Sequence, residues 1–110
     1  MKEDSNISFA DKVYALCKKI PKGRVSTYKD IGNALGGYGQ VYRAVGVALN
    51  RNSHAPIVPC HRVVNSNGNV GGFAHGTKNK IKLLKAEGIQ VVNGKIKEFK
   101  KVFFIITTSK

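Results

Sequence analysis

The residues of this chain best suited to chemistry are three neighbours, Cys60, His61 and Arg62. A cysteine attacks as its thiolate, so it needs a base or a positive charge nearby, and the histidine and the arginine offer both. Because adjacent side chains diverge in strands and helices alike, we expect a water to carry the proton from Cys60 to His61. Pro59 would hold the cysteine at the end of a rigid, extended segment. The pattern predicts a cysteine nucleophile, and the alternative is that Cys60 is one more small, buried apolar residue.

The charge of the chain indicates a polyanionic partner. Lysine and arginine number 19 against 6 acidic residues, which gives a formal net charge of +13. Nucleic acid is the usual partner for such an excess, and its binding should weaken steeply as salt rises. A membrane surface competes, but no lysine-rich stretch has a clean amphipathic face, so we expect no membrane contact. A merely solvated surface is the alternative for the late part of the excess. That part comprises Lys78, Lys80, Lys82, Lys85, Lys95, Lys97, Lys100 and Lys101.

Length and cysteine content favour one cytoplasmic domain. A chain of 110 residues can form one core, so we expect a single domain over residues 1–110. The charged first residues predict no signal peptide, and two cysteines fit a reducing compartment, so we expect a cytoplasmic protein held near the nucleoid by DNA. The apolar run at residues 102–106 is too short to span a bilayer and is expected to be a strand or a docking tail.

Metal chemistry is not expected. The histidines His54, His61 and His75 are scattered, and neither Cys-x-x-Cys nor His-x-x-x-His spacing occurs. These spacings are what most zinc sites require. We therefore expect no metal and no cofactor.

The first helix is predicted over residues 8–20. Ser8 followed by Asp11 could cap its start, and apolar residues then recur at helical spacing up to Pro21. Cys17 lies on the apolar stripe. We expect it to be inert core.

The next segment is typical of a helix-turn-helix. Thr27 and Asp30 form a second capping pair, which starts a short helix that ends at the glycines of residues 36–39. A third helix is expected over residues 40–49. Two short helices joined by such a turn commonly place the second helix against DNA.

That third helix carries little chemistry for reading bases. Arg43 is its one cation, and small residues such as Ala44, Gly46 and Ala48 surround it. Small residues permit close approach, and one arginine could enter the base stack, as minor-groove binding and base extrusion require. The alternative is that the small residues merely allow helix packing.

The second half of the chain adds short strands and one helix. Residues 65–69 predict a turn, so residues 63–64 and Val70 should flank a hairpin in the position of a wing. A helix is expected over residues 77–87, and Asn93-Gly94 predicts a second hairpin turn. The fold class is therefore expected to be mainly α with short β-hairpins, a winged helix-turn-helix.

These residues together resemble one family, the DNA-binding and active-site domain of O6-alkylguanine-DNA alkyltransferases, or methylated-DNA–protein-cysteine methyltransferases. The likeness covers roughly residues 9–88, and its central motif is Pro-Cys-His-Arg-Val at residues 59–63. Three further matches stand at family spacing, at residues 27–28, 43–46 and 83–88. The residues 89–110 form a tail outside the likeness.

The resemblance implies direct, irreversible repair of alkylated DNA. Cys60 matches the nucleophile that takes the alkyl group from O6 of guanine, and His61 matches the residue that deprotonates it through a water. Glu87 matches the carboxylate that orients the histidine, and Asn52 matches the asparagine that holds the active-site turn. The thioether product offers no carbonyl for hydrolysis, so the protein should react once.

The resemblance also implies how the lesion is reached. Arg43 matches a finger that fills the space of the flipped nucleotide, and Tyr28 matches the aromatic that helps rotate it. The partner is double-stranded DNA containing O6-alkylguanine, bound by a monomer. The expected DNA contacts are Arg43, Tyr28, Thr27, Ala44, Gly46 and Gln40. The expected substrate pocket is lined by Tyr28, Leu49, Val63, Val70, Gly71, Phe73, Ala74 and His75.

The chain departs from the family pattern in several places. The family often has a separate preceding domain that does not carry the matched residues, so we expect activity without it. Tyr42 stands where small residues are common and should alter the fit against the DNA backbone. Residues 53–56 depart from the usual proline placement. Ala74 replaces a frequent serine in the pocket loop.

Three other functions compete with alkyl transfer. An alkyltransferase-like lesion sensor would flip damaged guanine and recruit other repair proteins without transfer, but those proteins lack the reactive cysteine. A winged-helix regulator would fit the charge and leave Cys60, His61, Glu87 and Asn52 unexplained. A cysteine hydrolase would act on an ester or a peptide, which the basic surface does not support.

Overall fold

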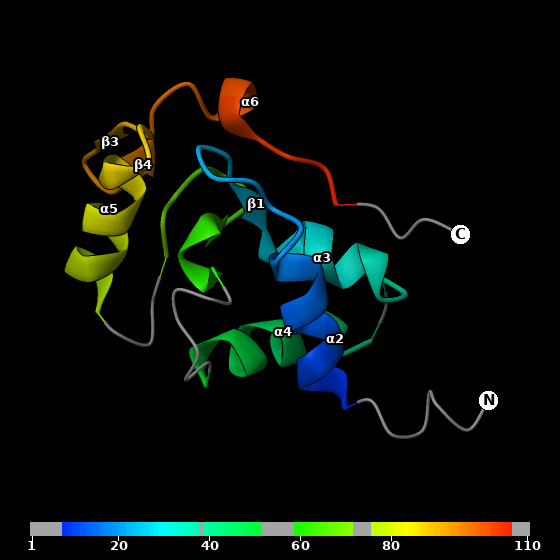
Figure 1. Cartoon of the computed structure of the whole chain (residues 1–110). Coiled ribbons are helices and arrows are strands. Elements are labelled where there is room, and N and C mark those ends of the chain that lie inside the picture. Colours follow the sequence, from blue (N-terminus) through cyan, green and yellow to red (C-terminus); the bar gives the residue numbers. More distant parts are fainter. Residues whose placement is uncertain (1–7, 38, 52–58, 72–75, 107–110) are drawn as a thin grey trace.

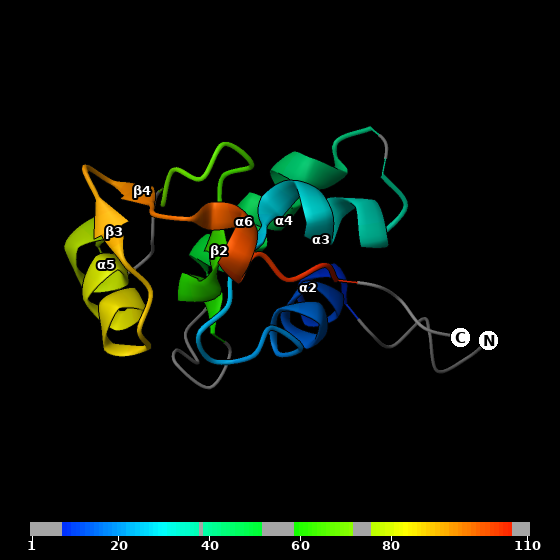
Figure 2. The same ribbon diagram turned by 90° about the horizontal axis from the view of Figure 1, so that it is seen from above.

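Three helices pack together at one end of the chain. The structure, a computed structural model, describes residues 8–37, 39–51, 59–71 and 76–106. The three helices are α2 (Phe9–Cys17), α3 (Tyr28–Ala34) and α4 (Val41–Asn50). They lie at one end of the molecule, and the segment of residues 77–96 lies at the other (Figures 1 and 2).

Side-chain caps fix where the first two helices begin. The Ser8 hydroxyl accepts a hydrogen bond from the Asp11 amide at 3.1 Å, and the Thr27 hydroxyl accepts one from the Asp30 amide at 2.9 Å. Each bond satisfies an amide that has no partner within the first turn of its helix. Both predicted capping pairs are confirmed.

The first helix is shorter than predicted. It ends at Cys17 rather than at Ile20, although Ile20 is fully buried. Pro21 follows, and a proline disfavours helical backbone at the residue before it. The last predicted turn therefore unwinds while its apolar side chain stays in the core.

Tyr42 fastens the turn between α3 and α4. Its hydroxyl donates to Asn33 Oδ1 at 2.5 Å and lies 3.1 Å from the carbonyl oxygen of Gly37. Its ring covers Gly32, where an added Cβ would come within 2.4 Å of a ring carbon. Tyr42, which departs from the family pattern, thus stabilises the turn of the helix-turn-helix. Its ring packs so closely on residue 32 that only glycine fits there.

The second half of the chain begins with the short 3₁₀ helix η1 (Cys60–Arg62) and the strand β2 (Val63–Val64). The strand β2 pairs in parallel with β1 (Ser26–Thr27). The predicted hairpin between residues 63–64 and Val70 is therefore wrong. The turn itself exists, since the Asn65 amide bonds the Asn69 carbonyl at 2.8 Å, but the strand before it pairs with a distant segment.

The helix α5 (Thr77–Ala86) follows, and then a hairpin of β3 (Val91–Val92) and β4 (Lys95–Ile96). Asn93 and Gly94 have φ values of 52° and 78°, which the tightest hairpin turns need. The predicted helix and the predicted hairpin turn are both confirmed, the helix ending one residue early.

The end of the described chain docks across the first half. After α6 (Phe99–Val102), Phe103 forms a parallel bridge with Val25, and the Ile106 amide donates to Asp30 Oδ2 at 2.6 Å. Ile106 is buried in the same cluster as the helices α2, α3 and α4. The apolar run at residues 102–106 is thus a docking tail. No helix in residues 8–37, 39–51, 59–71 or 76–106 is long and apolar enough to cross a bilayer.

Candidate active site

Cys60 opens η1 at the centre of the molecule, next to the helical cluster. It is 3% exposed and belongs to the buried cluster that also contains Leu49 and Val63, with Tyr28 packed against it. Both cysteines of the chain are thiols. A thiol this deeply buried needs neighbouring positive charge or a base to ionise.

His61 and Arg62 converge on one carboxylate. The Nε2 atom of His61 lies 3.0 Å from Glu87 Oε2, and Arg62 donates to both oxygens of Glu87 at 2.9 and 2.7 Å. Arg62 also donates to the Ile20 carbonyl at 2.8 Å. The carboxylate comes from the C-terminal end of α5, so this network ties α5 to η1 and to the segment that follows α2.

The network leaves one nitrogen of His61 for chemistry. The imidazole is 1% exposed, and its Nδ1 atom has no hydrogen-bond partner within the described part of the chain. With the hydrogen on Nε2 donated to Glu87, the lone pair is on Nδ1. That nitrogen can accept a proton.

Burial and pairing set the charge of this pair. Burial lowers the pKa of His61 below its usual value, and the hydrogen bond and charge of Glu87 only partly offset this. Burial works against ionisation of Glu87, but its bonds to Arg62 and His61 outweigh that effect and lower its pKa. The resting pair is a neutral imidazole beside an ionised carboxylate, which is a general base with a fixed orientation.

Lys80 is a site residue that the sequence reasoning missed. It was grouped with a solvated basic surface, yet it is 0% exposed. Its Nζ atom donates to the Tyr28 hydroxyl at 3.4 Å and lies 5.6 Å from the centre of that ring. The other seven lysines of the late group are exposed. The available signal was spacing, because Lys80 stands four residues before Leu84, on the buried side of α5.

The charges of the two cysteines affect the pKa values of Lys80 and Tyr28. Burial lowers the pKa of Lys80 to about 8, while Cys60 and then Cys17 raise it. Burial, then Cys60 and Cys17, raise the pKa of Tyr28 to about 12. Cys17 itself is fully buried, and burial followed by the influence of Cys60 raises its pKa to about 12, as expected of an inert core thiol. Lys80 therefore brings positive charge close to Cys60 and to the Tyr28 hydroxyl.

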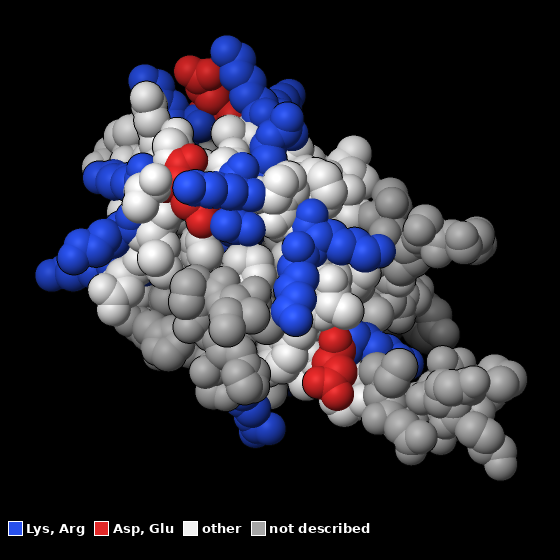
Figure 3. Space-filling model, in the orientation of Figure 1, with Lys and Arg blue, Asp and Glu red and all other residues white. Residues whose placement is uncertain are grey.

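The predicted DNA-contacting residues lie along α3 and α4. Gln40 is the residue before α4, and Arg43 is exposed on its first turns, with Ala44 and Gly46 half-buried behind it. Thr27 is only 4% exposed, because its hydroxyl caps α3. Lysine and arginine side chains spread over much of the face shown in Figure 3.

The predicted pocket residues lie in different parts of the structure. Tyr28, Leu49 and Val63 share the cluster of Cys60, whereas Val70 is buried in the other cluster with Leu84. Gly71 has a φ of 72° and lies against Asn65. The remaining predicted site residues, Asn52, Phe73, Ala74 and His75, lie outside the described residues. Within the described residues, no three side chains of His, Cys, Asp or Glu converge to hold a metal ion.

The family model of the 6-O-methylguanine DNA methyltransferase DNA-binding domain matches residues 8–89. The chain belongs to the 6-O-methylguanine DNA methyltransferase family. A relative from Metallosphaera sedula, named methylated-DNA–protein-cysteine methyltransferase, is 48% identical over 74% of this chain and 49% of its own length. The chain thus spans about half the length of this methyltransferase.

Solved structures agree with this assignment. Mycobacterium tuberculosis OGT in complex with DNA is 38% identical, with a TM-score of 0.68 over 73% of this chain and 49% of that one. Atl1 from S. pombe was solved in complex with damaged DNA containing O6-carboxymethylguanine. It is 30% identical, with a TM-score of 0.75 over 94% of this chain and 96% of its own. The expected helix-turn-helix fold class of this methyltransferase family is confirmed.

Proposed function

We propose that the chain repairs DNA by moving the alkyl group of O6-alkylguanine onto Sγ of Cys60, once per molecule. The observation that carries this proposal is the buried pair of His61 and Glu87 directly next to Cys60 in the chain, with Tyr28 packed against the cluster of Cys60 and Lys80 bonded to Tyr28. A regulator that only binds DNA has no use for a buried base aimed by a carboxylate.

The transfer begins with loss of the thiol proton. His61 Nδ1 accepts the proton of Cys60 through a water, and Glu87 and Arg62 hold the ring in place. The Cys60 thiolate attacks the alkyl carbon, forming a C–S bond while the bond from that carbon to O6 breaks. A soft, polarizable sulfur suits attack at saturated carbon.

The departing guanine carries the electron pair of the broken bond and needs a proton. Tyr28 donates its hydroxyl hydrogen, and Lys80, within hydrogen-bond reach of that hydroxyl, stabilises the phenolate and returns a proton to it. The products are neutral guanine in DNA and a thioether at Cys60. A thioether cannot be hydrolysed like an acyl-enzyme, so the reaction stops after one turnover.

Access to the lesion comes from the helix-turn-helix. The helix α4 enters the minor groove, Arg43 fills the space vacated by the flipped nucleotide, and Tyr28 helps to rotate it. Flipping costs a few kcal/mol, and less where alkylation has weakened the base pair. The flipped guanine lies against Tyr28, Leu49 and Val63, which share the cluster of Cys60.

Lesion binding without transfer is the second candidate function. The likeness to Atl1 over nearly the whole of both chains favours it. Cys60 and its buried base favour transfer instead.

One assay separates the two functions. A duplex with a single O6-methylguanine is titrated with protein from limiting amounts to excess, and intact lesion is measured by nuclease digestion and chromatography. We expect loss of one lesion per protein molecule, with no loss in Cys60→Ala and full loss in Cys17→Ala, the matched cysteine control. Tight binding with the lesion intact would establish the sensor function.

A further inference from the structure

The docking tail, residues 102–106, extends the small sheet formed by β1 and β2. The Val25 amide donates to the Val102 carbonyl at 2.9 Å, and the Phe104 amide donates to the Val25 carbonyl at 2.7 Å. The strand β1, which begins at Ser26, pairs with β2. Because a strand has one neighbour on each side, β1 lies between the tail and β2. The tail runs from α6 toward α3 (Figures 1 and 2).

This sheet connects the two halves of the candidate active site. Tyr28 follows β1 directly as the first residue of α3, and η1, which begins with Cys60, leads directly into β2. The register places Ser26 opposite Val63. The backbone position of Tyr28 relative to Cys60 therefore depends on where β1 is held. The tail, which holds β1 from the other side, lies beyond residues 8–89, which the family model matches.

Asp30 joins the tail to the turn of chain that carries Tyr28. Its Oδ2 atom accepts hydrogen bonds from the Ile106 amide at 2.6 Å and from the Ser26 hydroxyl at 3.2 Å. Its own amide donates to the Thr27 hydroxyl at 2.9 Å. Ser26, Thr27 and Ile106 are all buried, so water competes little for these bonds. One aspartate thus holds the chain on both sides of Tyr28.

The hydroxyl of Tyr28 is the group that this arrangement positions. In the proposed transfer it gives a proton to the departing guanine, and Lys80 donates to it at 3.4 Å. A proton donor must lie within about 3.2 Å of the atom that it protonates. A displacement of about 1 Å in an active site can lower a rate about 100-fold. Loosening of the first turn of α3 would therefore reach the chemistry through this side chain.

We propose that Asp30 and the docking tail together hold the Tyr28 hydroxyl at the leaving group during alkyl transfer. This inference rests on the proposed function, because it assigns the tail a part in that reaction. Asp30 is a positioning residue, since its carboxylate bonds the chain around Tyr28 and acts on the leaving group only through the tyrosine. The tail acts one step further away, through the Ile106 amide.

The first test compares substitutions at Asp30 with one at Asp11, an exposed residue that occupies the same place in α2, three residues after the cap. Transfer from a duplex containing O6-methylguanine is timed in single turnovers at saturating protein. Asp30→Ala should be about 10-fold slower than the wild type. Asp30→Asn retains an oxygen that can accept the Ile106 amide and should recover most of the rate. Asp11→Ala should leave the rate unchanged.

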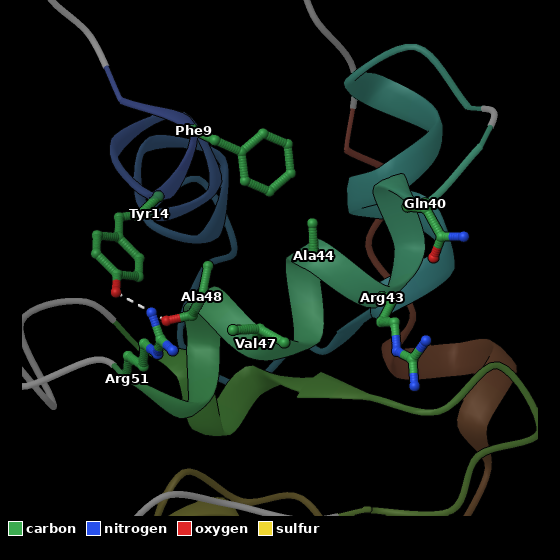
Figure 4. Close-up of a pocket in the computed structure, with 9 residues that line it drawn as sticks. Phe9, Tyr14, Gln40, Arg43, Ala44, Val47, Ala48 and Arg51 are labelled. Atoms are coloured by element: carbon green, nitrogen blue, oxygen red, sulfur yellow. Dashed lines mark hydrogen bonds between the residues drawn. The ribbon is translucent and has the colours of Figure 1, made fainter.

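A second comparison separates positioning from stability. In a Tyr28→Phe background, which lacks the hydroxyl, Asp30→Ala should not slow transfer further, although it should lower the free energy of unfolding as much as in the wild type. Tyr14→Phe is the control for a stabilising bond elsewhere, because the Tyr14 hydroxyl donates to the Ala48 carbonyl at 2.8 Å between α2 and α4 (Figure 4). Any slowing that it causes should be equal in both backgrounds. Equal slowing by Asp30→Ala in both backgrounds would overturn the positioning role.

The tail is tested by moving one introduced carboxylate along it by one residue. Ile106 is buried, whereas Ile105 is 64% exposed. Ile106→Asp places a charge in the apolar cluster near Asp30, so it should undock the tail and slow transfer about 10-fold. Ile105→Asp should do neither. Ile106→Ala is the milder variant, which keeps the amide and should slow transfer by a smaller factor.

The ring signals of Tyr28 in NMR spectra report its position whether or not transfer occurs. In protein that carries isotope-labelled tyrosine, these signals are assigned by their loss in Tyr28→Phe. They should shift in Asp30→Ala and Ile106→Asp and stay unchanged in Asp11→Ala and Ile105→Asp. Transfer by the wild type, with unchanged signals in Asp30→Ala and Ile106→Asp, would overturn the inference. Shifted signals in a protein that transfers nothing would overturn the proposed chemistry and leave the placement of Tyr28 by the tail standing.

Discussion

The interior around Cys60 and the outer face of α4 differ in the environment of their charged side chains: those of the interior are buried and paired, and those of α4 are exposed. His61 and Lys80 are almost wholly buried, and each has a partner on another element, Glu87 for the histidine and Tyr28 for the lysine. Arg43 on α4 is exposed, and so is Arg51. Buried charges are costly, so they persist where partners orient them for a reaction, whereas exposed charges are free to meet phosphate.

The largest expected effect is the loss of the interior carboxylate. Glu87→Gln removes the charge that orients His61 and pairs with Arg62, so we expect alkyl transfer to slow about 100-fold and the free energy of unfolding to fall by about 2–4 kcal/mol. Single-turnover kinetics and urea unfolding measure the two effects.

A matched exposed pair provides the control. Glu98 pairs with Lys101 at 3.0 Å, but these side chains are 53% and 79% exposed. Glu98→Gln should change stability by less than about 0.5 kcal/mol and leave transfer unchanged. Equal effects of the two substitutions would remove the contrast between the interior and the surface.

The next effect concerns the buried lysine and depends on pH. The pKa of Lys80 is about 8 in the folded chain, and its ordinary value of 10.5 applies to the unfolded chain. Between these two pH values the unfolded chain therefore binds more protons than the folded chain. The free energy of unfolding of the wild type should therefore rise with pH across this window. Lys80→Met lacks the group and should be the more stable protein at pH 7, by at most roughly 3 kcal/mol, with the advantage shrinking toward pH 10.

Unfolding curves of both proteins from pH 7 to pH 10 test this. A difference that stays constant over the range would mean that the lysine is not buried with a lowered pKa. Transfer by the methionine variant should also slow about 10-fold, since Tyr28 loses its positive partner.

A third effect concerns the joint between α3 and α4. Gly32→Ala places a Cβ against the Tyr42 ring and should destabilise the fold by about 1–3 kcal/mol. In a Tyr42→Ala background, the destabilisation caused by Gly32→Ala should be much smaller, because the two sites share one contact. Gly46→Ala is the control, since its Cβ would meet nothing within 4 Å. If the destabilisations of the two single variants simply add in the double variant, the contact between Gly32 and Tyr42 does not explain them.

The smallest effect concerns the exposed arginine. Arg43→Ala should slow repair in duplex DNA about 10-fold, because one cation less stabilises the vacated stack, and should slow it less than about 3-fold in single strands. Repair rates on matched duplex and single-stranded substrates make the comparison. Equal losses on both would count against the finger role.

Local signals predicted much of this molecule. The capping residues Ser8 and Thr27 and the turn at Asn93-Gly94 act within a few residues, and the structure has each of them. The helix-turn-helix followed from glycines and helical spacing alone. The exposed face of α4 could therefore be predicted in outline.

Long-range features could not be predicted in the same way. The strand β2 pairs with β1 rather than with its neighbour after the turn, and no local pattern encodes that choice. Lys80 looked like one lysine of a solvated series, and only the packing of α5 against η1 buries it. The pairing of Glu87 with His61 was expected from the family resemblance, whereas the two-oxygen bond from Arg62 was not expected at all.

The most direct test of the central claim is to find the transferred group. The protein is reacted with a duplex containing O6-methylguanine, and its intact mass and its peptides are measured by mass spectrometry. We predict one added methyl group, located on the peptide that contains Cys60 and absent from the peptide that contains Cys17. An unmodified protein that still holds the lesion, or a methyl group on any other residue, would contradict the account.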